Sequence, residues 1–148
     1  MSSELLAIDA FVTAILTNDA ELMAALPGGV NSDSAPEGTP FPYLIFSEAS
    51  SGDRNAVGSF RRSVRSTYLF KVVTQAAAYD GIGVAAGKMD ELLQRAHGKQ
   101  VSIALSGVPA SVIMAIVRTQ PYKRPYTDEN GREYRELGGF YRCHVRAV

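Results

Sequence analysis

The clearest pattern in the chain is an alternation of apolar and polar residues over Ser63–Gln75. The apolar positions are Tyr68, Phe70 and Val72, and the polar positions are Arg65, Thr67 and Lys71. A period of two in a segment rich in aromatic and β-branched residues predicts a half-buried β-strand. At about 3.3 Å per residue it would be roughly 40 Å long, well above the usual strand length. We therefore expect it to be a central strand of an antiparallel sheet.

Three other segments have apolar residues at helical spacing. Ser3–Thr17 predicts the first helix, and Asp19 is placed to cap a short second helix over Ala20–Leu26. Ala76–His97 predicts a third helix that starts near Asp80, its expected N-cap.

Further strands are expected on both sides of the central one. Tyr43–Glu48, Ser111–Gln120 and Arg132–Val148 have the composition of strands, and Val101–Leu105 predicts at most a short one. In the last long strand Tyr141, Cys143 and Val145 should face one way, and Arg142, His144 and Arg146 the other.

The connecting segments are rich in turn-forming residues. Val30–Phe41 predicts a surface loop, and Ser50–Phe60 is too long for a tight hairpin and predicts a mobile arm. Asp128–Gly131 ends in Asn-Gly, which favours a type I′ hairpin turn. Gly138-Gly139 predicts a kink in the following strand.

These elements predict an α+β fold, with a mostly antiparallel sheet of four to five strands flanked by an N-terminal helix pair and one central helix. The 148 residues fit a single domain over 1–148. No apolar run is long enough to cross a membrane, and the start of the chain lacks the features of a signal peptide. The single cysteine, Cys143, is typical of a reducing compartment. We expect an intracellular product with no membrane contact.

The net charge is zero, but the charges are unevenly distributed along the chain. Residues 1–60 carry eight acids and one base, a balance of −7, whereas residues 61–148 carry fourteen bases and seven acids, a balance of +7. Either the fold mixes these charges, or opposite faces of the monomer carry opposite signs. The second arrangement would favour head-to-tail contacts between copies, of the kind that closes rings.

Motifs for cofactor or catalytic chemistry are weak. Gly81–Ala86 matches a dinucleotide-binding fingerprint, but it lies about five residues after the strand, where the fingerprint needs an immediate turn. We expect instead that Gly83 and Gly87 let the helix approach another backbone closely. His97 and His144 have no ligand partners at metal-binding spacing, and alternation favours a buried structural thiol at Cys143. The sequence therefore predicts no enzyme, no cofactor and no metal.

Two groups of residues are candidates for contacts with partners. A basic stripe would form if the strand carrying Arg142, His144 and Arg146 lay beside the one carrying Arg65 and Lys71. Three interpretations of such a stripe are open: its residues are solvated, they face another subunit, or they bind nucleic acid. Binding to nucleic acid usually uses interleaved aromatic residues, and Phe140 is the only one nearby. The second group is the hairpin segment Tyr122, Lys123, Arg124, Pro125 and Tyr126, an amphipathic surface suited to a partner.

The order of these motifs resembles the tail terminator, or tail completion, proteins of long-tailed bacteriophages. The resemblance is carried by Pro-Glu-Gly-Thr-Pro-Phe-Pro-Tyr-Leu-Ile-Phe at 36–46, Ser-Thr-Tyr-Leu-Phe-Lys-Val-Val-Thr at 66–74, Gly-Lys-Met-Asp-Glu-Leu-Leu at 87–93 and Asp-Glu-Asn-Gly-Arg-Glu-Tyr at 128–134. It covers nearly the whole chain and is centred on Phe41-Pro42-Tyr43.

The resemblance implies a structural virion protein, assembled in the host cytoplasm, that forms a ring of six subunits on the completed tail tube. Its partners would be other copies of itself, the major tail tube protein and the head–tail connector, with DNA passing through the lumen. Arg65, Lys71, Arg142, His144 and Arg146 are then candidate subunit or lumen contacts. Phe41, Tyr122, Lys123, Arg124 and Tyr126 are candidate axial contacts.

Two alternatives remain open at this point. One is a head–tail connector or stopper ring of the phage neck. The other, from a different class, is a small-ligand-binding regulatory domain that uses a cleft beside Ala76–Gly87.

Overall fold

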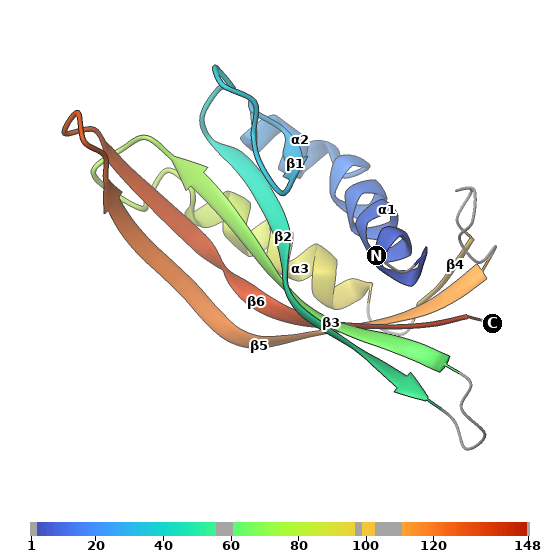
Figure 1. The fold of residues 1–148 in the computed structure, drawn as a ribbon. Coiled ribbons are helices and arrows are strands. Elements are labelled where there is room, and N and C mark those ends of the chain that lie inside the picture. The colour runs from blue at the N-terminus through green and yellow to red at the C-terminus, as the bar shows by residue number, and fades with distance from the viewer. Residues whose placement is uncertain (1–2, 56–60, 97–98, 103–110, 148) are drawn as a thin grey trace.

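The computed structural model describes residues 3–55, 61–96, 99–102 and 111–147, and it shows helices packed on one face of a six-stranded sheet (Figure 1). The strand order is β1-β2-β3-β6-β5-β4, and only the β1–β2 pair is parallel. The predicted α+β class with a mostly antiparallel sheet is confirmed. The elements are α1 (Ser3–Thr17), α2 (Ala20–Ala25), β1 (Val30–Ser32), β2 (Tyr43–Asn55), β3 (Arg61–Thr74), α3 (Gly83–Arg95), β4 (Lys99–Ser102), β5 (Ser111–Thr127) and β6 (Glu133–Ala147).

Strand β3 is central, as its alternation predicts. It pairs with β2 on one side and with β6 on the other along nearly its whole length. Tyr68, Phe70 and Val72 point to the helix-covered face, called the inner face below, and are at most 2% exposed. The opposite face of the sheet, called the open face, has no helix over it among the described residues (Figure 1).

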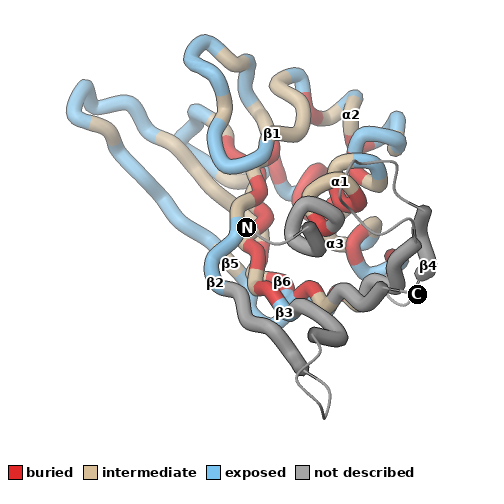
Figure 2. The backbone as a smooth tube through the Cα atoms, turned by 45° about the vertical axis from the view of Figure 1, so that its right-hand side comes forward, coloured by how far each residue is buried: buried red, intermediate tan, exposed pale blue. Residues whose placement is uncertain are grey.

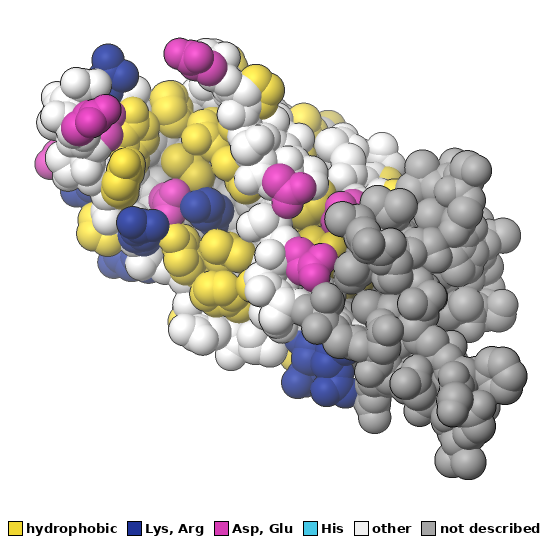
Figure 3. Space-filling model, in the orientation of Figure 1, with side chains coloured by type: hydrophobic (Ala, Val, Ile, Leu, Met, Phe, Trp, Pro, Cys, Tyr) yellow, Lys and Arg dark blue, Asp and Glu magenta, His cyan; other side chains and the backbone are white. Residues whose placement is uncertain are grey.

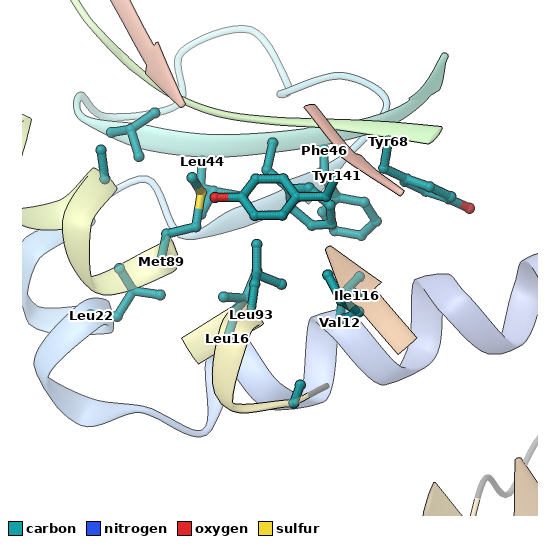
Figure 4. Packing of buried hydrophobic residues seen from close by; sticks show 14 of the residues in the cluster. Val12, Leu16, Leu22, Leu44, Phe46, Tyr68, Met89, Leu93, Ile116 and Tyr141 are labelled. Carbon is teal, nitrogen blue, oxygen red and sulfur yellow. The ribbon is translucent and has the colours of Figure 1, made fainter. Parts of the chain in front are cut away.

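The core lies between the inner face and the three helices. Figure 2 shows buried positions where the sheet and the helices meet, and Figure 4 shows their side chains interdigitating. Helix α1 contributes Val12 and Leu16, and α3 contributes Met89 and Leu93, all of them fully buried. Each such side chain contributes about 1.5–3 kcal/mol to folding by leaving water. Helix α2 is capped by the side chain of Asp19, which accepts from the Leu22 amide at 2.8 Å, as predicted.

Two tyrosines of the inner face are hydrogen-bonded to the helices above them. The Tyr68 hydroxyl donates to Asp9 of α1 at 2.8 Å, and the Tyr141 hydroxyl donates to Asp90 of α3 at 2.5 Å. The pKa of both phenols is raised well above the ordinary value for tyrosine, first because they are buried and then because each is bonded to a carboxylate. Each bond satisfies a polar group inside the core and fixes the position of a helix over the sheet.

The start of α3 differs from the prediction. The helix begins at Gly83, with buried Ile82 at its N-cap and no side-chain cap bond, so Asp80 is not the cap. The expected close packing through Gly83 and Gly87 is also wrong, because both are exposed and a Cβ at either would meet no other atom within 4 Å. The packed side of α3 is instead set by larger residues such as Ile82 and Met89.

Two predicted loops contain strand. Strand β2 continues to Asn55, in register with β3 apart from shifts after Glu48 and after Arg54, so the mobile-arm prediction is wrong over Ser50–Asn55. Residues 56–60 lie outside the described part of the chain. The expected loop over Val30–Phe41 begins with the short strand β1. The predicted short strand appears as β4, and positions 103–105 lie outside the described residues.

Strand β5 is longer than predicted and includes Pro121 and Pro125. Beyond its first four residues it pairs only with β6 among the described residues, so it is an edge strand there. Proline has no amide hydrogen and is tolerated where that hydrogen would point outward. Because residues four apart share the same side of a strand, we infer that both proline nitrogens lie at the outer edge.

The hairpin between β5 and β6 differs in turn type from the prediction. The Gly131 amide donates to the Asp128 carbonyl at 3.1 Å, which closes a turn over Asp128–Gly131. Gly131 has a φ of 80°, whereas Asn130 is not among the described residues of positive φ, so the turn is not type I′. The Asp128 side chain accepts from the amides of Asn130 and Arg132, and these bonds lower the pKa of that carboxyl.

Gly138 permits the close approach of β6 to β3. A Cβ at this position would lie 1.9 Å from the Phe70 carbonyl oxygen and 2.8 Å from the Lys71 Cα. The predicted kink at Gly138-Gly139 leaves the β3–β6 register unbroken, and the shift lies across the sheet in β5, between Arg118 and Gln120.

We predict that Gly138→Ala destabilises the protein by about 1–3 kcal/mol or more, because backbone atoms cannot move aside as a flexible side chain can. The matched control is Gly87→Ala, which adds the same methyl group to an open position of α3 and should stabilise the fold by up to about 1 kcal/mol. Urea unfolding of both variants measures this difference. Equal effects of the two substitutions would contradict the steric explanation.

We also predict a pH-dependent benefit from Asp9→Asn. The pKa of Asp9 is raised, mainly because the carboxyl group is partly buried. The hydrogen bond from Tyr68 lowers this pKa, whereas the charges of Asp33 and Glu48 raise it further. The native state therefore holds the Asp9 proton more tightly than the unfolded state, so stability falls as pH rises from about 4 through the raised pKa. An amide keeps an acceptor for Tyr68 without the charge.

The free energy of unfolding of Asp9→Asn, relative to the native chain, should thus increase between about pH 4 and about pH 7. Denaturant titrations at several pH values measure it, with Asp80→Asn at an exposed position as the control for an acid-to-amide change. A difference that does not vary with pH would show that Asp9 is not destabilised by its charge.

Candidate functional site

The open face of the sheet brings together most of the predicted contact residues. Strands β3 and β6 are neighbours, with Arg65 opposite His144 and Thr67 opposite Arg142. Arg65 and Arg142 are exposed and His144 is partly buried. The backbone register places Arg146 opposite Ser63 at the same end of the sheet, although its side chain lies outside the described residues. The predicted basic stripe is thus formed by adjacent strands.

Lys71 does not belong to this stripe. Its Nζ lies 2.9 Å from a carboxylate oxygen of Glu136 and 5.9 Å from the centre of the Tyr122 ring. The Tyr122 hydroxyl donates to the other oxygen of Glu136 at 2.7 Å. The Lys71 charge is therefore balanced within the chain, and Tyr122 is held against the open face.

A row of aromatic rings covers the end of the open face next to the β5–β6 turn. Phe41 lies 5.3 Å from Tyr43 and 5.9 Å from Tyr134, and Tyr134 lies 5.7 Å from Tyr126, measured between ring centres. Phe41 and Tyr126 are 36% and 45% exposed, which is unusual for side chains of this size. We call Phe41, Tyr43, Tyr126 and Tyr134 the aromatic row.

The aromatic row lines a groove of about 820 Å³ between the 35–41 loop and the hairpin of β5 and β6. Buried Val73 is among its lining residues, and Glu37, Arg132 and Glu136 are its charged members. Figure 3 shows apolar side chains gathered at this end of the open face. Apolar surface that remains exposed in a folded chain is typical of a site for another protein.

The loop that carries Phe41 is fixed to the sheet by its own backbone. The Gly28 amide donates to the Pro42 carbonyl at 3.2 Å, and the Leu44 amide donates to the Gly29 carbonyl at 2.9 Å. A Cβ at Gly28 would lie 2.1 Å from the Pro40 carbonyl oxygen, so this close approach requires glycine. Phe41 is thus presented from an anchored position.

The predicted hairpin contacts divide between the two faces of the sheet. Arg124 lies over the ring of Tyr126 at 5.4 Å on the open face. Lys123, in contrast, lies 4.6 Å from the ring of Tyr79, which Arg135 approaches from 5.7 Å. Lys123 is exposed, but it packs on the loop before α3 and does not belong to the aromatic row.

The described residues include the side-chain types that bind metals and one cysteine thiol. No three His, Cys, Asp or Glu side chains among them are grouped closely enough to hold a metal ion. Burial raises the pKa of the Cys143 thiol to about 12, as expected for the predicted structural thiol. No helix within the described part of the chain is long and apolar enough to span a membrane.

Comparison with known proteins identifies the family. The family model described as "Tail completion protein gp17" matches residues 10–112, which is more than half of the chain. The chain belongs to the gp17 tail completion family. Membership places it among the structural proteins of phage tails. No curated protein sequence matches the chain.

Two solved structures share the fold of this tail completion protein, and a third is less similar. A chain from the virion of a native gene transfer agent particle is 20% identical, with a TM-score of 0.56 and 92% coverage of each chain. A second structure is 19% identical, with a TM-score of 0.52 over 100% of this chain and 98% of the other. The gp17 protein of bacteriophage SPP1 is 13% identical with a TM-score of 0.44, covering 96% of this chain and 89% of that one.

Two members of the aromatic row were absent from the sequence-based candidates. Tyr43 lies in β2 and Tyr134 in β6, and they meet Phe41 and Tyr126 only when the strands are ordered in the sheet. Alternation along the strands is the one signal that could have indicated them. Even-numbered residues of β5 and β6 near the turn lie on the open face, and so do odd-numbered residues of β2.

Proposed function

We propose that this chain is a tail terminator, a ring subunit that caps the completed tail tube and joins it to the head–tail connector. The observation that carries the proposal is membership of the tail completion family together with a sheet face left open by all described helices. A single-domain subunit over residues 1–148, in a ring of six, is the arrangement we favour. Its location is the virion, after assembly in the host cytoplasm.

We assign the aromatic row to an axial partner. Its exposed rings and its 820 Å³ groove offer a preformed surface with aromatic side chains, and aromatic residues are enriched where protein interfaces are energetically strongest. The major tail tube protein is the partner we favour for this surface, because a terminator must recognise the last tube ring.

We assign the basic stripe of Arg65, Arg142, His144 and Arg146 to the lumen, where DNA passes. The stripe lies at the other end of the open face from the aromatic row, so one subunit can present both surfaces. Phosphates attract such a surface without reading sequence.

The two alternative functions, a connector or stopper ring and a ligand-binding domain, are not equally compatible with the structure. A connector or stopper ring would use the same surfaces but would contact the portal, so the position in the particle decides between it and a terminator. The ligand-binding alternative has little support: the cavity beside Gly83 and Gly87 holds about 200 Å³, below the roughly 300–1,000 Å³ of typical ligand sites.

The experiment that tests the proposed function is imaging of phage particles that carry labelled protein, combined with removal of its gene. A terminator should lie between tail tube and connector, and its loss should give tails of uncontrolled length that fail to join heads. Label against the portal with tails of normal length would favour the stopper, and absence from the particle would contradict both.

We predict that Tyr126→Ala lowers affinity for the tube end by about tenfold or more, because it removes the most exposed ring of the row. The control is Val84→Ala, which trims a side chain that is 80% exposed on α3, away from the row. Co-sedimentation with purified tubes measures binding, and thermal melting checks that both variants fold. Equal binding by the two variants would show that the aromatic row does not contact the tube.

We further predict that Arg142→Glu leaves ring assembly intact but impairs DNA retention or release in complete particles, because a carboxylate would repel phosphate. Particle assembly is scored by microscopy and DNA retention by nuclease sensitivity. Failure of assembly itself would show that Arg142 contacts a neighbouring subunit instead of the lumen.

A further inference from the structure

The sheet has two exposed edges on opposite sides of the subunit. At one edge β1 pairs only with Leu44–Phe46 of β2, so the rest of β2 beyond Phe46 has a strand on one side only among the described residues. At the other edge β4 pairs only with Ser111–Met114, which leaves Val117–Thr127 of β5 with β6 alone in the described part of the chain. The strand order separates these edges by the whole width of the sheet.

The β1–β2 edge is acidic along β1 and the first part of β2. Residues 1–53 contain no Lys or Arg. Asp33 directly follows β1, and its amide donates to the Phe46 carbonyl at 2.9 Å, while Glu48 lies two residues further along β2. Both are exposed, and both are close enough to Asp9 of α1 to repel its charge. Figure 3 shows acidic side chains gathered beside β2.

Among the described residues, these carboxylates have no ion-pair partner. No ion pair joins Asp33 or Glu48 to another described residue, whereas Lys71, Lys88 and Arg95 all have acidic partners. Negative charges held together without a cation favour the approach of a basic surface.

The β5 edge is basic. Its outer segment, Val117–Thr127, contains Arg118, Lys123 and Arg124 and no Asp or Glu. All three are exposed. Arg118 lies 3.9 Å from Asp90, and the other two lie over tyrosine rings, which leaves the hairpin edge with an excess of positive charge.

The backbone limits how two such edges can meet. Pro121 and Pro125 remove two of the outward-pointing amides, so a continuous ladder of hydrogen bonds cannot form along this part of β5. Contact along Pro121–Thr127 must therefore be made by side chains, and Lys123 and Arg124 are the charged side chains available there.

We propose that a second copy of this chain docks head to tail, with its basic β5 edge against the acidic β1–β2 edge of the first. The inference rests on the proposed ring, and it identifies which surfaces hold the ring together. Because the two edges are different surfaces, each copy keeps one of each free, and repetition of the contact closes a ring if the rotation fits. In this arrangement the acidic first part of one chain meets the basic second part of the next across each contact.

Charge reversal provides the test. Asp33→Lys with Glu48→Lys makes both edges basic, and Lys123→Glu with Arg124→Glu adds acids to the second edge. Each double variant alone should form rings on tail tubes at least about tenfold less well, since like charges then face each other across the contact. Melting temperatures check folding, and Val84→Lys, at a position of α3 that is 80% exposed, controls for a change of charge alone.

Mixing the two double variants provides the decisive result. The basic first edge of one variant then meets the acidic second edge of the other, so alternating mixed rings should form where neither variant assembles alone. Native mass spectrometry detects such rings by mass, and the variant carrying all four reversals should assemble by itself.

The outcomes separate the inference from the proposed function. If both double variants form rings as readily as the native chain, or if mixing restores nothing, the edge contact is wrong while a ring on the tube stands. If the native protein self-associates neither alone nor on tubes, the ring proposal and the edge contact are both overturned.

Discussion

The packing of β3 against the helices is the interaction on which the rest of the structure depends. Phe70 and its neighbours on the inner face fill the space beneath α1 and α3, and hydrogen bonds from Tyr68 and Tyr141 hold those helices in place. Since all described helices lie on this one side, the other face of the sheet keeps its aromatic and basic side chains in water. One-sided covering therefore leaves a whole face of the sheet available for contact with other proteins.

Much of this arrangement could be predicted from the sequence, because the core obeys simple periodicities. The alternation through Tyr68 and Phe70, and that through Tyr141 and Cys143, correctly gave the inner face of both strands. Asp19 was recognised as a cap because its effect is local. Asp80 failed in the same role because burial of Ile82 sets where α3 begins, and that is a tertiary effect.

The candidate site was predicted less completely, because it depends on which strands become neighbours. Arg65 and Arg142 were correctly grouped once β3 and β6 were assumed to pair. Lys71 was grouped with them although Glu136, far along the chain, neutralises it. The aromatic row needs a loop and three separate strands for its rings to meet, and no local pattern records that arrangement.

The two prolines of β5 affect whether other strands can add to this edge of the sheet. A long edge with every amide available would let any exposed strand in the cell add to the sheet, and such growth ends in fibres. Pro121 and Pro125 make this edge a poor template for backbone pairing while leaving its side chains accessible. Along this edge the chain therefore resists the indiscriminate addition of other strands.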